Sequence, residues 1–118
     1  MALEVFRPRE LGPKSWGTEL LVAHTDHYTG KILSMRAGAS GPLQYHVHKD
    51  ETFHLVSGKA DVTMEIEGKL VTRRMKPGES YHVPPGTIHR VAAVKDCVFF
   101  EASTPHFEDR VNVEDRFR

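Results

Sequence analysis

The feature that most constrains the fold is a succession of short β-rich runs separated by glycine and proline turn signals. Over residues 60–66 apolar and polar side chains alternate, which predicts a strand with one buried face. The Glu-Gly-Lys sequence at residues 67–69 predicts a tight hairpin into a second strand. Residues 18–25 and 28–38 predict two more strands on either side of a polar turn. Eight or so short strands predict an all-β jelly roll or a nearly closed antiparallel barrel.

The chain length limits the number of domains. A chain of 118 residues is long enough for one hydrophobic core and too short for two ordinary ones, so we expect a single domain over residues 1–118. An immunoglobulin-like sandwich is the competing architecture, but it would not explain why histidines cluster. Pro84 and Pro85 are expected outside the middle of a central strand, because proline has no N–H to donate.

Composition excludes several classes of function. The 16 basic and 16 acidic residues cancel, and neither sign forms a run. We therefore expect no nucleic-acid binding and no attachment to a membrane. The single cysteine, Cys97, cannot form an internal disulfide, and the charged N-terminal sequence does not resemble a signal peptide. These features predict a soluble protein of the cytoplasm.

Potential metal ligands are concentrated in residues 43–58, LQYHVHKDETFHLVSG. Residues two apart in a strand point to the same face, so Gln44, His46 and His48 are expected to face one way. Three buried polar groups need a common partner, and a divalent cation would satisfy several of them at once. Two ligand sets are open at this point: His46 and His48 with Glu51, or Gln44 and His46 with Glu51.

The intervals between these residues resemble two motifs of the cupin family, whose fold is a double-stranded β-helix, a jelly-roll barrel. The residues that match the first motif are Gly38, Gln44, His46, Glu51 and Gly58, and those that match the second are Gly78, Pro84, Gly86 and His89. The resemblance implies a metal site formed by Gln44, His46, Glu51 and His89, with His48 lining the pocket instead. The chain departs from the family in having glutamine for the first histidine and Ala93 for the usual asparagine.

The implied ligand set offers nitrogen and oxygen donors and no thiolate. Such a set suits one divalent ion of zinc, iron, manganese, nickel or cobalt, and the sequence does not choose among them. The four motif glycines are expected to have positive φ at turns that aim the ligands.

A longer resemblance covers nearly the whole chain. The segments WGTELLV, KILSMRAG, SYHVPPGTIHRV and EDRVNVEDRFR are similar to the cupin domain of type II mannose-6-phosphate isomerases. This resemblance implies the exchange of an aldose phosphate and a ketose phosphate. It also implies substrate-binding residues, for which we consider Lys31, His48 and Arg90.

Several assignments remain open within this reading. The general base is not identified, and the candidates are Glu101, Glu79, His48 and a metal-bound hydroxide. Residues 114–116 of the tail match the family too and are expected to serve docking or dimer formation. Two other functions compete: a non-catalytic ligand-binding or regulatory module and an iron-dependent oxygenase. A homodimer is the expected assembly, because two-fold symmetric dimers are the commonest soluble oligomers.

Overall fold

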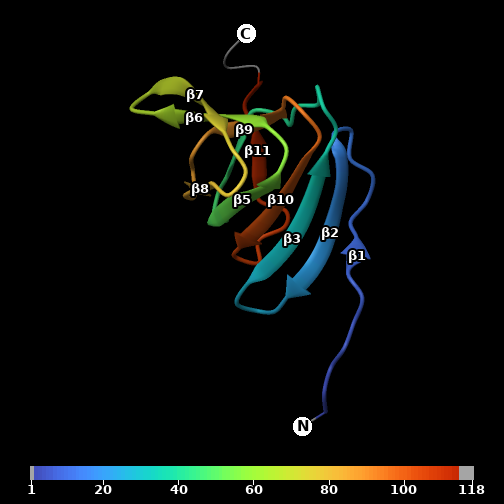
Figure 1. Cartoon of the computed structure of the whole chain (residues 1–118). Coiled ribbons are helices and arrows are strands. Elements are labelled where there is room, and N and C mark those ends of the chain that lie inside the picture. The colour runs from blue at the N-terminus through green and yellow to red at the C-terminus, as the bar shows by residue number, and fades with distance from the viewer. Residues whose placement is uncertain (1, 115–118) are drawn as a thin grey trace.

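A computed structural model describes residues 2–114 of the chain, so Asp115 and Arg116 of the predicted docking element lie outside it. Within the described residues the chain forms β1 (Arg9–Glu10), β2 (Gly17–His24), β3 (Thr29–Met35), β4 (Gln44–His46), β5 (Glu51–Ser57), β6 (Ala60–Ile66), β7 (Lys69–Met75), β8 (Ser80–Val83), β9 (His89–Ala93), β10 (Cys97–Ser103) and β11 (Arg110–Asn112). The predicted all-β jelly roll is confirmed (Figure 1).

The strands form two antiparallel sheets. The six-stranded sheet has the order β1-β2-β3-β10-β5-β8, and the five-stranded sheet has the order β11-β4-β9-β6-β7. Because β4 and β5 follow each other in the chain but belong to different sheets, residues 47–50 connect the two layers. The described residues include no helix that is long and apolar enough to cross a membrane.

The hairpin of β6 and β7 shows how the local sequence sets the structure. Ile66 and Lys69 are paired, so Glu67 and Gly68 form a two-residue turn. Both have positive φ, 51° and 81°. A type I′ turn requires these values, and its twist matches the twist of the two strands that it joins. The hairpin projects from the body of the molecule (Figure 1). The structure also ends β8 at Val83, so the two prolines that follow lie outside the ladder, as predicted.

The hydrophobic core lies between the two sheets. Its fully buried members come from both layers, and they include Leu55 and Phe99 of the six-stranded sheet and Ala60 of the five-stranded sheet. Cys97 is buried in this cluster and its thiol donates to the carbonyl groups of Lys59 and Lys95. A second, smaller cluster contains Leu43, Ile88 and Val113. Apolar packing therefore fills one part of the interior and leaves another part to polar side chains.

The turns that carry the candidate ligands have the backbone expected of them. Positive φ values are found at all four motif glycines, Gly38, Gly58, Gly78 and Gly86. At Gly58 a side chain is also excluded by space, because a Cβ atom would lie 2.1 Å from the carbonyl oxygen of Asp96. The glycines of both motifs thus lie at defined turns of the backbone.

Candidate metal centre

The two sheets enclose a cavity of about 410 Å³. Both layers contribute polar side chains to its wall: Glu19, Lys31, Glu51 and Glu101 from the six-stranded sheet, and Gln44, His46 and His89 from the five-stranded sheet. All of these except Gln44 are buried. Buried charges are costly unless they are paired or bind a ligand, so this wall is the candidate functional site.

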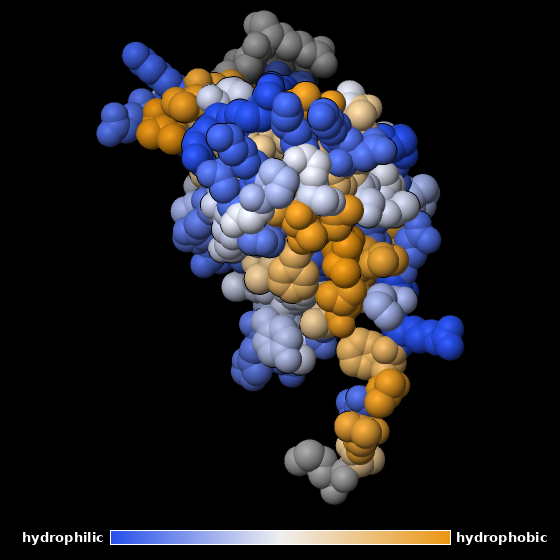
Figure 2. Space-filling model, viewed as in Figure 1, coloured by the Kyte–Doolittle hydropathy of each residue, from blue (hydrophilic) through white to orange (hydrophobic). Residues whose placement is uncertain are grey.

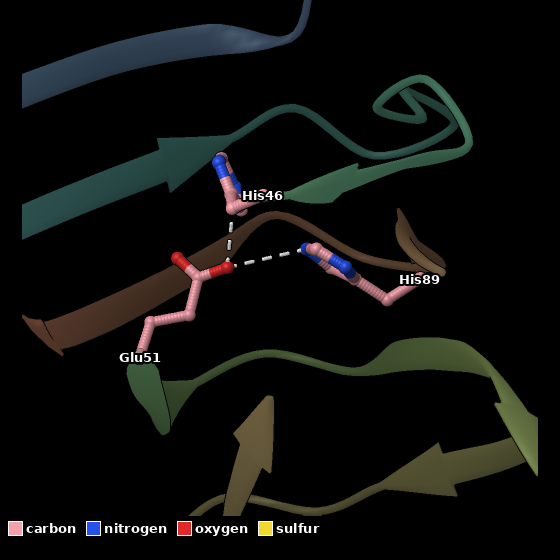
Figure 3. Close-up of side chains that lie close together, drawn as sticks. All are labelled: His46, Glu51 and His89. Carbon is pink, nitrogen blue, oxygen red and sulfur yellow. Dashed lines mark ion pairs between the residues drawn. The ribbon is translucent and has the colours of Figure 1, made fainter. Parts of the chain in front are cut away.

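His46, Glu51 and His89 converge within the cavity. The Nε2 atoms of both histidines lie 3.3 Å from the same carboxylate oxygen, Oε2 of Glu51 (Figure 3). In the described part of the chain these three residues form the group of histidine, cysteine and acidic side chains able to hold a metal ion, with their ligand atoms all within 4.8 Å of one another. The three predicted ligands come from β4, β5 and β9, which are separated in sequence and belong to both sheets.

Hydrogen bonds orient both imidazole rings. His89 Nδ1 donates to the backbone carbonyl of Thr87 at 2.9 Å, and His46 Nδ1 donates to Oδ1 of Asp109 at 3.1 Å. A ring that carries its proton on Nδ1 presents a lone pair on Nε2 when it is neutral. The Nε2 lone pairs of two neutral rings would both face the anionic Oε2 of Glu51. These negative groups repel one another unless a positive charge lies between them.

The protonation tendencies of Glu51 and His46 suit a cation at this position. Burial disfavours ionisation of Glu51, but the imidazole of His89 and the ammonium of Lys49 outweigh it and hold the pKa of Glu51 below its ordinary value. Burial lowers the pKa of His46, although the Glu51 carboxylate opposes this shift. An ionised carboxylate beside a neutral imidazole is the combination that a divalent cation binds.

Two oxygens in the cavity lack hydrogen bonds. Among the described residues no donor reaches the buried Oε1 of Gln44 or the buried Oε2 of Glu51. Buried oxygens without partners are uncommon and call for an explanation. Gln44 is paired with His89 across β4 and β9, so its side chain projects from the same face. The residues present therefore fit a metal ion held by Gln44, His46, Glu51 and His89.

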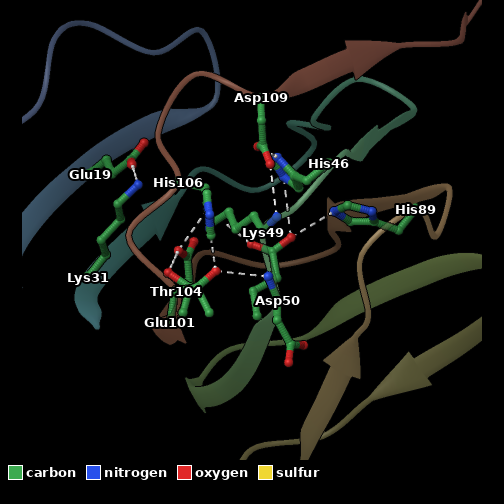
Figure 4. A network of polar contacts seen from close by, with 12 residues as sticks. Glu19, Lys31, His46, Lys49, Asp50, His89, Glu101, Thr104, His106 and Asp109 are labelled. Carbon is green, nitrogen blue, oxygen red and sulfur yellow. Dashed lines mark hydrogen bonds and ion pairs between the residues drawn. The ribbon is translucent and has the colours of Figure 1, made fainter. Parts of the chain in front are cut away.

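Lys49 and Glu101 form a second polar group beside the candidate ligands. Lys49 Nζ lies 3.2 Å from Glu51 Oε1 and 2.9 Å from Glu101 Oε2, and Glu101 also accepts a hydrogen bond from Ser103 (Figure 4). Burial disfavours the charged amine, but the two carboxylates outweigh it and raise the pKa of Lys49. Lys49 is thus a buried cation that faces the cavity.

Sequence reasoning missed Lys49 and Asp109. Lys49 lies inside the first motif, but a lysine in a polar turn is ordinarily exposed, so its burial has no local signal. Asp109 contacts His46 from 63 residues further along the chain. Burial opposes its ionisation, yet hydrogen bonds from the backbone of His48 and Lys49 keep the pKa of Asp109 below its usual range. Only the fold brings these two residues to the site.

The predicted substrate-binding residues Lys31 and Arg90 both line the cavity. Lys31 is buried, and its Nζ lies 2.7 Å from Oε1 of Glu19 and 4.9 Å from the ring centre of Phe107. Arg90 lies 3.6 Å from Glu114, between guanidinium nitrogen and carboxylate oxygen. Glu114 belongs to the tail that we expected to serve docking, so within the described residues that tail contacts the cavity rim.

His48 differs from its expectation. The strand ends at His46, and His48 is exposed and does not line the cavity. Its ring instead lies 5.7 Å from that of His106, between centroids. The assumed alternation fails because the backbone N–H of His48 binds Asp109 rather than continuing a ladder. His46, Glu51 and His89 are brought together, and Gln44 lines the same cavity beside His89, whereas His48 does not.

Fold and site together define a double-stranded jelly roll with candidate metal ligands inside the barrel. A family model described as a cupin domain matches residues 31–102, and the chain belongs to this family. The resemblance inferred from the two motifs is confirmed.

This chain matches a part of the length of each curated relative. The chain is 32% identical over 87 residues to a mannose-1-phosphate guanylyltransferase of Salmonella muenchen, with 74% of this chain and 16% of the relative covered. It is 33% identical over 89 residues to the alginate biosynthesis protein AlgA of Pseudomonas putida, with 75% and 16% covered. The chain thus spans about a sixth of the length of these relatives.

Solved structures support the fold. KdgF from a Halomonas species superposes with a TM-score of 0.73 at 24% identity, covering 86% of this chain and 89% of that one. CapF from Staphylococcus aureus gives a TM-score of 0.81 at 17% identity, covering 93% and 32%. Oxalate decarboxylase from Bacillus subtilis, whose Mn(II) centres have been studied, gives 0.75 at 21% identity, covering 89% and 30%. At these identities the likeness concerns the fold alone.

Proposed function

We propose that this cupin binds one divalent metal ion and acts on sugar phosphates as an aldose–ketose isomerase. The observation that carries the proposal is the convergence of His46, Glu51 and His89 beside the buried pair of Lys49 and Glu101, in one cavity. The similarity to a guanylyltransferase of mannose 1-phosphate supports a sugar phosphate as the ligand class. Because the chain covers a small part of that relative, the activity is inferred from the site.

The residues that would hold the metal are Gln44, His46, Glu51 and His89. Their nitrogen and oxygen donors suit zinc, iron, manganese, nickel or cobalt. When bound, such an ion would polarise the carbonyl oxygen of the sugar and stabilise the negative charge that develops on it.

Phosphate binding is assigned to Lys31 and Arg90. Both are cations that line the cavity, and both are paired with a carboxylate, Glu19 and Glu114 respectively. A phosphate group would compete with these carboxylates for charge-assisted hydrogen bonds. His48 is left out of this assignment because it is exposed and lies outside the cavity wall.

Proton transfer is assigned to Glu101. Of the three side chains considered as the base, Glu101 is buried in the cavity wall, whereas Glu79 pairs with Arg73 on the surface and His48 is exposed. In this reaction Glu101 would take the proton from the carbon next to the aldehyde and return it to the former aldehyde carbon, while the proton of the neighbouring hydroxyl passes to the former aldehyde oxygen. The ammonium of Lys49, 2.9 Å away, would hold the carboxylate in place.

The proposal is tested by metal analysis of protein purified without chelators and by a turnover screen of hexose aldose and ketose phosphates. Glu101→Gln should lower turnover by about 100-fold or more while sugar phosphate still binds. Glu79→Gln is the matched control and should leave turnover unchanged. Binding without turnover in the wild-type chain would favour the non-catalytic module, and oxygen consumption with iron would favour the oxygenase.

A further inference from the structure

Asp109 joins three parts of the site through one carboxylate. Its Oδ1 accepts from Nδ1 of His46 at 3.1 Å (Figure 4). Its Oδ2 accepts from the backbone N–H groups of His48 at 2.7 Å and Lys49 at 2.8 Å. Its backbone carbonyl also accepts from Val47 N at 3.2 Å. Asp109 directly precedes β11, the edge strand that pairs with β4. One residue therefore binds three consecutive residues, 47–49, of the turn that follows β4.

The contact with His46 decides which ring nitrogen carries the proton. Oδ1 of an ionised aspartate accepts and does not donate, so it holds the proton of His46 on Nδ1. The lone pair of Nε2 then points at Oε2 of Glu51, 3.3 Å away. In metal-binding histidines, the tautomer is set by a hydrogen bond to the ring nitrogen that does not bind the metal.

The contacts on the other oxygen decide where Lys49 lies. The backbone N–H of Lys49 is held by Oδ2 of Asp109, and the side chain of Lys49 reaches Glu51 and Glu101 from that position. A shift of this turn would move the ammonium away from both carboxylates. The same carboxylate therefore supports the candidate metal ligand and the candidate proton-transfer pair.

We infer that Asp109 is a positioning residue that fixes the tautomer of His46 and the place of Lys49, and so sets the metal affinity of the site. The inference rests on the proposed metal centre. It predicts a specific effect of replacing one oxygen of Asp109 by an NH₂ group, which is a change of nearly equal shape.

The variant Asp109→Asn has a defined amide orientation. The two backbone N–H groups at the Oδ2 position require the amide oxygen there, because NH₂ is a donor and cannot accept from them. The NH₂ group then faces Nδ1 of His46, which must accept, so the ring proton moves to Nε2. In that tautomer Nε2 cannot bind a metal ion until the proton is lost or displaced.

The full chain is titrated with zinc alone by calorimetry. Asp109→Asn should weaken zinc binding roughly 10–100-fold, the range found when an outer partner of a metal ligand is lost. Asp61→Asn is the matched control, because Asp61 pairs with Arg74 on the surface and does not line the cavity. Its zinc affinity should equal that of the wild type.

A second measurement separates orientation from a merely structural role. At about pH 8, above the ordinary imidazole pKa, ¹⁵N spectra of metal-free protein labelled at histidine distinguish the two tautomers. His46 should carry its proton on Nδ1 in the wild type and on Nε2 in Asp109→Asn.

The inference is wrong if wild-type His46 carries its proton on Nε2, a result that requires no variant to fold. It is also wrong if Asp109→Asn binds zinc as tightly as the wild type. Should the wild type bind neither zinc nor another divalent metal, the proposed function fails, and the wild-type tautomer still decides the role of Asp109.

Discussion

At the scale of single residues, Gln44 is the unusual member of the candidate metal site. An amide oxygen is a weaker donor than an imidazole nitrogen, yet here it is buried and lacks a hydrogen-bond partner among the described residues. Its strand pairing with His89 places both side chains on one face. His48, the other residue that the sequence allowed as a ligand, is exposed.

This difference yields a prediction about metal affinity. Gln44→His should tighten zinc binding and Gln44→Ala should weaken it, because the first change adds a stronger donor and the second removes one. The loss should be about tenfold or more. His48→Ala is the control and should leave the affinity unchanged. Calorimetric titration of the three variants measures the effect, and a loss confined to His48→Ala would contradict the assignment.

At the scale of elements, β2 and β3 carry a buried ion pair of Glu19 and Lys31, 2.7 Å apart. Burial disfavours ionisation of Glu19, but the hydrogen bond and charge of Lys31 outweigh it and hold the pKa of Glu19 below 4.5. Breaking a buried pair leaves the other charge without a partner. This ion pair therefore makes the two strands sensitive to acid.

The prediction concerns the free energy of unfolding. Glu19→Gln should destabilise the protein by about 3 kcal/mol at neutral pH, because Lys31 would lose its partner. This value is the lower end of the range for broken buried pairs, and we choose it because the pair borders a cavity. Since the folded pKa is depressed, the stabilisation is fully present above about pH 4.5 and is lost as the pH falls through the folded pKa. Urea unfolding between pH 7 and pH 3 should show the variant losing less stability on acidification than the wild type. Exposed Glu10→Gln serves as the control and should follow the wild type.

The strands themselves were largely predictable, whereas the end of one strand was not. Alternation identified β6 and the turn residues identified its hairpin with β7, because both signals are local. The motif intervals also identified the three residues that converge. The end of β4 at His46 depends on hydrogen bonds to Asp109, 61 residues after His48. No periodicity in residues 43–58 carries that information.

At the scale of the whole molecule, two protrusions expose apolar side chains. Figure 2 shows them on the N-terminal arm that precedes β1 and on the hairpin of β6 and β7. The residues are Leu3, Val5 and Phe6 on the arm and Ile66, Leu70 and Val71 on the hairpin. Exposed apolar clusters often mark protein interfaces, so they support the homodimer that the sequence predicts. Cytoplasmic location likewise stays a prediction.

The homodimer prediction has a direct measurement. Sedimentation equilibrium at micromolar concentration should give twice the chain mass of 13.4 kDa. Replacing Leu3 and Val5 by serine should weaken the dimer if the arm contributes to it, because apolar burial would be lost. Serine at the exposed Val94, which is on neither protrusion, is the control. A wild-type chain that sediments as a monomer would contradict the prediction.

The candidate ligands also link the two layers, because Glu51 belongs to the six-stranded sheet and His46 and His89 belong to the five-stranded sheet. A metal that binds the folded chain alone stabilises it by about 2.7 kcal/mol at 100 times its Kd, on the order of 10 °C in Tm for a domain of this size. Zinc should therefore raise the Tm of the wild type, and a chelator should reverse the rise. His46→Ala and His89→Ala should abolish the shift, while His54→Ala and His82→Ala, whose side chains do not line the cavity, should retain it. Equal loss in all four variants would mean that zinc stabilises the protein from outside the barrel.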